Sequence, residues 1–142
     1  MFTTPAVDGG TIWIKPGNTS FTLSQMLHTG FLKMPFVFGW IGFTRFMRFS
    51  DLVDKWHDQC VDKAHWYLAT VGVDPYRQSQ GIGSALLQPT LDRADSDGLP
   101  CYLETLAERN LPLYERHGFH VAASGEVPDG GPMAWAMVRP PQ

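Results

Sequence analysis

A glycine-bearing loop between residues 78 and 84 carries the residue types that hold an anion. Gln78 is followed by Gly81 and Gly83, and a helical pattern begins at this point. Glycine lets the backbone approach a bound group closely, and several backbone N–H groups can converge on it. A helix N-terminus adds an effective charge of about +0.5 at the same place. The segment therefore predicts an anion-binding loop, although an ordinary glycine-rich loop before a surface helix has the same composition.

Two common nucleotide-binding loops do not match this spacing. A P-loop needs a lysine directly before its serine or threonine, and here Gly83 precedes Ser84. A dinucleotide-binding loop has a third glycine where Leu86 stands and follows its strand directly, whereas seven residues separate Val73 from Gly81. The sequence therefore excludes ATP binding of the P-loop type and disfavours dinucleotide binding.

The loop is one of several segments that together resemble the core of a GNAT N-acetyltransferase. These segments are VGVDP at 71–75, QSQGIGSALL at 78–87 and NLPLYERHGF at 110–119. The loop pattern of that family is R/Q-x-x-G-x-G/A, and its later signature is an aromatic residue followed shortly by Gly-Phe. The resemblance covers His65 to Arg139, roughly half of the chain. It implies an α/β fold with a mixed β-sheet flanked by helices. It also implies an N-terminal truncation, without the family's usual first strand and two helices, and a helical insertion before the central strand.

The resemblance implies an acetyl-CoA site. Backbone groups of Val71 and Val73 would pair with the pantetheine arm as a neighbouring strand would. The N–H groups of residues 78–84 would hold the pyrophosphate, and Asn110 would contact the coenzyme near its thioester. The expected coenzyme-binding residues are Val71, Gly72, Val73, Gln78, Ser79, Gln80, Gly81, Ile82, Gly83, Ser84, Asn110 and Tyr114.

The resemblance also implies direct transfer of the acetyl group to a primary amine in a ternary complex. Tyr114 is expected beside the sulfur as the general acid, and a backbone N–H near Gly72 would stabilise the oxyanion, particularly if Gly72 marks a bulge. The amine must lose a proton, and His65 and Glu104 are the candidate bases. Each is equally compatible with a structural place at a strand end or a sheet edge. A covalent route through Cys101 is less favoured, because buried cysteines on strands are usually inert.

Length and composition limit the remaining function classes. The 142 residues predict a single domain, and the net charge of −3 argues against nucleic-acid binding. Cys60 and Cys101 have neither metal-ligand nor disulfide-framework spacing, so no metal site is expected. The N-terminus has no basic and apolar leader pattern, which predicts a cytoplasmic protein.

The hydrophobic pattern predicts the elements that must position these residues. Strands are expected at 2–7 and 11–15, joined by a turn at Asp8-Gly9-Gly10. A helical segment spans 19–62, with Ser20 and Ser50 as N-caps and interruptions near Gly30 and Pro35. The expected coenzyme-binding core spans 65–139. It comprises a strand at 65–73, a helix at 81–94 kinked by Pro89, a strand at 101–105, a short helix capped by Asn110 and ended by Gly118, and a hairpin of strands at 119–123 and 133–139 around PDGG.

Two alternatives to an active enzyme remain open at this level. The first is a coenzyme-A-binding or regulatory module that has lost catalysis. The second is a membrane-surface or partner-binding protein that uses the apolar residues between 31 and 49, a run too short and too interrupted by basic residues to span a bilayer. The sequence leaves open whether the acceptor is a small-molecule or a protein amine and whether the chain forms a homo-oligomer.

Overall fold

The computed structural model describes residues 2–3, 8–17, 34–61 and 64–142 of the chain. Their strands form one sheet in the order β1-β2-β3-β4-β6-β5. The strands are β1 (Phe2–Thr3), β2 (Gly9–Ile14), β3 (Trp66–Val73), β4 (Cys101–Thr105), β5 (His120–Glu126) and β6 (Met133–Arg139). The helices are α2 (Met34–Cys60), α3 (Ile82–Asp97) and α4 (Leu111–Arg116), with 3-10 turns η2 (Pro75–Arg77) and η3 (Glu108–Asn110).

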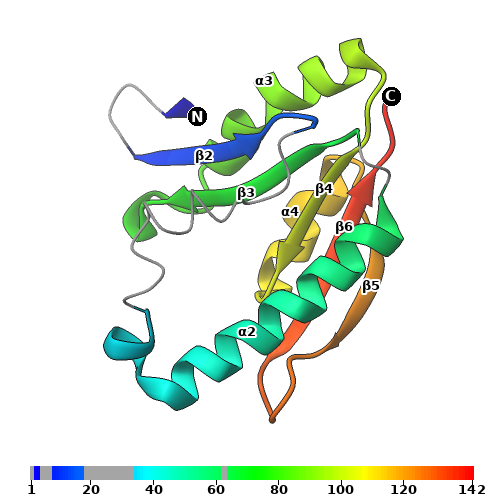
Figure 1. Ribbon diagram of the computed structural model, residues 1–142. Helices are drawn as coiled ribbons and strands as arrows, with labels where there is room; N and C mark the ends of the chain where they lie inside the picture. The colour runs from blue at the N-terminus through cyan, green and yellow to red at the C-terminus, as the bar shows by residue number, and fades with distance from the viewer. Residues whose placement is uncertain (1, 4–7, 18–33, 62–63) are drawn as a thin grey trace.

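The sheet is mixed, as predicted, and it opens between β3 and β4. All neighbouring strands are antiparallel except β3 and β4, which run parallel. Their pairing is short, because it joins Trp66–Leu68 to Cys101–Leu103 and then ends. Beyond Leu68, β3 continues to Val73 and turns away from β4 (Figure 1). In the part of the chain that the structure describes, one side of β3 from Ala69 to Val73 has no neighbouring strand.

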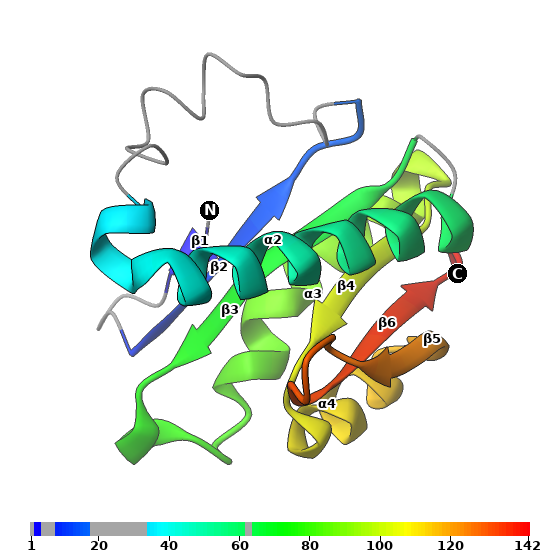
Figure 2. The same ribbon diagram turned by 60° about the horizontal axis from the view of Figure 1, so that its bottom comes forward.

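The helices cover opposite faces of this sheet. α3 and α4 pack on one face, and α2 crosses the other (Figures 1 and 2). Side chains alternate along a strand, so β4 contributes to both cores. Cys101 and Leu103 join Leu87, Leu91 and Phe119 in the α3 core. Tyr102 joins Trp56, Val127, Ala134 and Ala136 in the α2 core.

α2 differs from the predicted helical segment in its extent. The predicted features at Ser20 and Gly30 lie outside the described residues. Ser50 lies inside α2 and does not cap a helix, so that prediction is wrong. The helix continues through it because Phe49 and Leu52, on either side of it, both pack on the α2 core. Gly39, with φ 69° and ψ 166°, breaks the helical backbone near the start, and Pro35 stands in the first turn, where its missing N–H is tolerated.

The predicted turn at Asp8-Gly9-Gly10 is also wrong. Gly9 and Gly10 lie in β2, and β1 pairs with β2 antiparallel. A Cβ on Gly9 would lie 2.8 Å from the carbonyl oxygen of Gly72. Glycine is therefore required here by the close approach of β3. Of the strand predicted at 2–7, residues 4–7 lie outside the described part of the chain.

The second half of the chain follows the predicted order closely. α3 continues through Pro89 to Asp97, three residues past its predicted end, and Gly98 ends it with φ 64°. Gly118, with φ 86°, follows α4, and its N–H donates to the carbonyl oxygen of Glu115. β5 and β6 form the predicted hairpin, with β5 extended to Glu126. No helix in the described residues is long and apolar enough to cross a bilayer.

A buried arginine ties the short helix α4 to the rest of the fold. Arg139 is 3% exposed and donates to both carboxylate oxygens of Asp95 at 2.7 Å. Its Nε donates to the carbonyl oxygen of His117 at 2.8 Å, directly after α4. The guanidinium holds the pKa of Asp95 below its usual range. This bridge joins β6, α3 and the end of α4, and so fixes the helix that carries Tyr114.

Candidate active site

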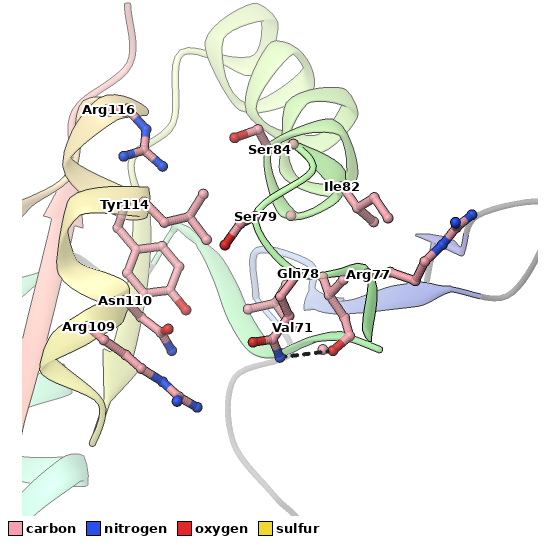
Figure 3. Close-up of a pocket in the computed structure, with 15 residues that line it drawn as sticks. Val71, Arg77, Gln78, Ser79, Ile82, Ser84, Arg109, Asn110, Tyr114 and Arg116 are labelled. Carbon is pink, nitrogen blue, oxygen red and sulfur yellow. Dashed lines mark hydrogen bonds between the residues drawn. The ribbon is translucent and has the colours of Figure 1, made fainter. Parts of the chain in front are cut away.

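A cavity of about 580 Å³ opens where β3 leaves β4 (Figure 3). It lies between the end of β3, the loop that leads into α3, and the η3–α4 segment. Eleven of the twelve residues expected to bind a coenzyme line it, the exception being Gln80. Gln80 is exposed, and its side chain donates to the carbonyl oxygen of Tyr76. The structure thus brings together residues from three separate sequence segments.

The loop presents unpaired backbone donors to this cavity. Ser79 and Gly81 have left-handed backbones, with φ 62° and 79°, which turn nearby N–H groups toward a common side. The first helical hydrogen bond of α3 runs from the N–H of Ala85 to the carbonyl oxygen of Gly81. The N–H groups of residues 82–84 precede it and have no partner within the helix. This arrangement fits a phosphate group at the positive end of α3.

The free side of β3 contributes a second set of backbone groups. The N–H of Asp74 donates to the carbonyl oxygen of Asp8 at 2.7 Å. By the alternation of an antiparallel ladder, the backbone groups of Val71 and Val73 then point away from β2. Gln78 Nε2 already donates to the carbonyl oxygen of Val73 at 3.2 Å (Figure 3).

The bulge in β3 does not lie at Gly72, where it would have favoured the oxyanion prediction. The register shifts between Ile12 and Trp13, which pair with Thr70 and Leu68, so Ala69 is the extra residue. The same alternation directs the N–H of Gly72 toward β2. The backbone donors on the open side of β3 are therefore those of Val71 and Val73.

Tyr114 and Asn110 reach the cavity from the opposite wall (Figure 3). Tyr114 is 4% exposed and packs edge-on against Phe119, with ring centroids 6.1 Å apart. Burial raises the pKa of its phenol, so the hydroxyl is protonated at neutral pH. Asn110 precedes α4, but its side chain makes no capping hydrogen bond, contrary to prediction. It is directed instead toward the cavity, beside Tyr114.

Arginines in the lining were not predicted. Arg77, Arg109 and Arg116 all line the cavity, and no carboxylate is found among its described lining residues. Arg109 and Arg116 extend from the α4 wall toward the glycine loop, whereas Arg77 points away and pairs with Asp8 at 3.3 Å (Figure 3). Each arginine lies within two residues of a motif position, which is the signal that could have identified it. Their charge favours an anionic ligand.

Glu104 and His65, the two predicted bases, do not line the cavity. Glu104 follows the last β4 residue paired with β3, and strand alternation places it on the same α2 face as Tyr102. Burial raises its pKa from 4.5 to about 7, although the nearby hydroxyls of Tyr67 and Tyr102 favour its charged form. His65 is 2% exposed, and its Nε2 lies 2.6 Å from Nε2 of His57.

Two buried polar atoms beside Glu104 have no hydrogen-bond partner of ordinary geometry. They are Oε1 of Glu104 itself and the hydroxyl of Tyr102. Buried polar groups are nearly always paired, because desolvation without a partner costs about 1–3 kcal/mol. A donor such as an amine would satisfy both atoms.

Cys101 has the properties of a core residue. It is fully buried on the α3 face, and burial raises the pKa of its thiol to about 11. A thiol that is protonated at neutral pH is a poor nucleophile. Elsewhere in the described residues, no three His, Cys, Asp or Glu side chains converge as metal ligands would.

Comparison with known proteins assigns this arrangement to a family. The model of the acetyltransferase (GNAT) family matches residues 35–119, more than half of the chain. The chain belongs to the GNAT family. An uncharacterized N-acetyltransferase of Schizosaccharomyces pombe is 31% identical to this GNAT chain over 117 residues, covering 78% of the chain and 47% of the relative.

Solved structures of other acetyltransferases also match. The ribosomal-protein-S18-alanine N-acetyltransferase of Escherichia coli is 32% identical, with a TM-score of 0.48, over 55% of each chain. An acetyltransferase of Corynebacterium glutamicum is 37% identical, with a TM-score of 0.47, over 55% of this chain and 42% of its own. The chain thus spans about half the length of these relatives. The family match begins at Pro35 and includes α2, whereas the motifs indicated the family only from His65 onward.

Proposed function

We propose that this chain is an acetyl-CoA-dependent N-acetyltransferase that transfers an acetyl group directly to a primary amine in a ternary complex. One observation carries the proposal. The opening between β3 and β4 joins an unpaired strand edge, a helix N-terminus with free donors and a buried tyrosine in a single cavity. This combination occurs in a chain of the GNAT family.

The cavity walls fit the parts of acetyl-CoA. The backbone groups of Val71 and Val73 would pair with the amides of the pantetheine arm. The N–H groups at the start of α3 would hold the pyrophosphate, and Arg109 and Arg116 would add charge-assisted contacts to its phosphates. When bound, the coenzyme supplies an activated thioester. Gln78 must give up or share its hydrogen bond to Val73 for the strand edge to be used in full.

Proton transfer would be divided between the two faces of the sheet. Tyr114 is protonated at neutral pH and would donate its proton to the sulfur as the C–S bond breaks. Glu104, with a pKa of about 7, would accept the proton that the amine loses as the N–C bond forms. An alkylamine with a pKa near 10.4 costs about 4.6 kcal/mol to deprotonate at pH 7, so such a base is needed.

The positions of these two groups define the path of the acceptor. Tyr114 enters the opening from the α4 side, whereas Glu104 lies on the α2 side, next to the point where β3 and β4 separate. An amine that reaches Glu104 therefore approaches under α2, opposite the coenzyme. There it would meet the unpaired Oε1 of Glu104 and the hydroxyl of Tyr102.

Calorimetric titration of the purified chain with acetyl-CoA tests the binding site. Gly83→Glu places a carboxylate at the start of α3, where the Cβ would lie 3.4 Å from Leu113 at the cavity wall. We expect this variant to weaken binding at least about 100-fold through charge repulsion and loss of space. Ser96→Glu is the matched control, because it adds the same charge at the exposed far end of α3 and should bind normally.

Turnover is then measured as release of the coenzyme thiol with a panel of diamines, amino sugars and peptides. Binding with thiol release supports the enzyme. Binding that Gly83→Glu abolishes, without release for any amine, would favour a coenzyme-A-binding module that lacks catalysis. A folded chain that does not bind acetyl-CoA contradicts the proposal.

A further inference from the structure

A group of stacked and hydrogen-bonded rings lies under the C-terminal half of α2, outside the coenzyme cavity. The His57 ring of α2 stacks on Tyr102 of β4, with centroids 4.6 Å apart and planes 14° apart. Its centroid also lies 5.2 Å from that of the Tyr67 ring of β3. His65, directly before β3, meets the His57 ring edge-on, with centroids 4.6 Å apart. Three separate elements of the fold therefore meet at one imidazole.

The contact between the two histidines fixes the orientation of the His57 ring. Their Nε2 atoms are 2.6 Å apart, so one imidazole donates a hydrogen bond and the other accepts it. His65 is 2% exposed and directly precedes β3, so it gives His57 a rigid anchor. A ring held along its edge by a hydrogen bond and on its face by stacking has little freedom to rotate.

The electrostatic surroundings keep this hydrogen bond intact at neutral pH. Burial, and then the neighbouring charge of His65, lower the pKa of His57, against the opposing effect of Asp58 and Asp54 on α2. The other titratable groups around the rings are Cys60 on α2, Tyr67 on β3, and Tyr102 and Glu104 on β4. With His57 neutral, one lone pair remains available to accept the bond.

Two of these rings, Tyr67 and Tyr102, lie beside Glu104, the proposed base. Tyr102 is fully buried, and its hydroxyl and that of Tyr67 lie close enough to Glu104 to favour the charged carboxylate. The hydroxyl of Tyr102 interacts with Glu104 but has no hydrogen-bond partner of ordinary geometry, so hydrogen bonding alone holds this phenol weakly. Packing therefore helps to hold it, and His57 covers one face of the Tyr102 ring.

We propose that the His57–His65 pair is a positioning element that clamps the Tyr102 ring, so that this ring stays packed beside the Glu104 carboxyl and keeps water from it. The clamp follows from the contacts themselves. Its catalytic meaning rests on the proposed function, in which Glu104 accepts the proton of the amine. His57 and His65 are positioning residues, because neither reaches the coenzyme cavity.

The titration of Glu104 reports on the clamp without any need for turnover. The chain contains four glutamates, Glu104, Glu108, Glu115 and Glu126, so ¹³C labelling of glutamate carboxyls gives a spectrum of four signals. The signal lost in Glu104→Gln identifies Glu104, whose titration midpoint in the wild type is expected near pH 7.

Two substitutions of His57 separate the effect of its ring from the effect of its hydrogen bond to His65. His57→Gln keeps a hydrogen-bonding group but removes the ring, so Tyr102 loosens and water reaches Glu104. Burial is the largest cause of the raised pKa of Glu104 and outweighs the opposing effect of the tyrosine hydroxyls, so we expect the Glu104 midpoint to fall by about one pH unit or more toward its ordinary range. His57→Phe keeps the ring and loses the bond to His65, and a smaller fall in the same direction is expected. His120→Gln, at an exposed position on β5, is the control and should leave the midpoint unchanged.

The outcomes distinguish the clamp from a purely structural role. The proposal is supported if the Glu104 midpoint is lowest in His57→Gln, intermediate in His57→Phe and highest in the wild type. An unchanged midpoint in His57→Gln, even with a lower melting temperature, overturns it. If His57→Gln does not fold, His57→Phe decides alone by the same criterion.

Kinetics separate this inference from the proposed function. With an active amine acceptor, the acid limb of kcat/KM should move to lower pH together with the Glu104 midpoint in the His57 variants. An acid limb that stays fixed while the midpoint moves removes Glu104 as the base and leaves the clamp standing. If the variants are active and both the acid limb of kcat/KM and the Glu104 midpoint stay unchanged, the clamp is contradicted and the proposed enzyme function is not.

Discussion

The two faces of the sheet share β4 but surround it with opposite chemistry. On the α3 and α4 face, Cys101 and Leu103 lie in an apolar core, and the polar groups gather at its rim around an open cavity. On the α2 face, Tyr102 and Glu104 are packed beneath a helix, among histidine and tyrosine rings. One short strand therefore packs into an apolar core on one side and into a buried cluster of titratable side chains on the other.

This difference follows from what each task requires. A large anionic ligand needs an accessible surface with free backbone donors and arginines, and the loop before α3 and the α4 wall provide both. A carboxyl with a pKa near 7 needs removal from water, which α2 provides by covering Glu104. The faces meet where β3 and β4 separate, which is where the proposed acyl transfer would occur.

Loss of the Tyr114 hydroxyl is expected to have the largest effect. In Tyr114→Phe the ring still fills its place, so the affinity for acetyl-CoA should change less than about twofold, whereas kcat should fall by about 10²–10³ because the general acid is lost. Coenzyme thiol release measures kcat. Tyr76→Phe is the matched control, because Tyr76 is 92% exposed and lies outside the cavity lining. Equal activity of Tyr114→Phe and wild type would remove Tyr114 from the mechanism.

Trp56→Ala tests whether the two faces are energetically separate. Trp56 is 8% exposed in the α2 core, so its removal should lower the free energy of unfolding by about 3 kcal/mol in urea denaturation. Trp40→Ala, on the same helix but 72% exposed, should change it by less than about 0.5 kcal/mol. Acetyl-CoA affinity, measured well below the melting temperature, should stay unchanged in both. A clear loss of affinity in Trp56→Ala would show that the faces are coupled.

The pH dependence of Glu104 is the smallest of these effects and the most specific. Glu104 must be ionised to act as a base, so kcat/KM should fall about tenfold for each pH unit below 7, and Glu104→Gln should lose this limb.

Stability should show the opposite trend. Because the folded pKa of Glu104 is raised from 4.5 to about 7, the native state gains stability from this group below pH 4.5 and loses it as the pH rises through 7. The unfolding free energy of the wild type, relative to Glu104→Gln, should therefore fall between pH 5 and pH 8. Parallel pH profiles of the two proteins would show that Glu104 is not held in a buried environment.

The features read correctly from the sequence are those that depend on local backbone chemistry. Gly81 and Gly118 adopt left-handed backbones that other residues rarely adopt, so they marked the loop before α3 and the end of α4. The hairpin around Asp129 and Gly130, both at positive φ, was equally visible. The failures have a physical reason too. Gly9 resembled a turn residue in the sequence. Glycine is required there because the backbone of Gly72, far away in the sequence, leaves no room for a side chain.

By itself, the sequence determined the glycine loop, the placement of Tyr114 on a short helix and the succession of core strands and helices along the chain, because neighbouring residues encode these features. Tertiary structure alone decided which face of β4 carries Glu104, how Arg109 and Arg116 converge on the loop, and how His57 meets His65 and Tyr102. These relations join residues from separate elements. They arise when α2 and α4 pack against the sheet, and that packing sets the burial, and therefore the charge state, of each group.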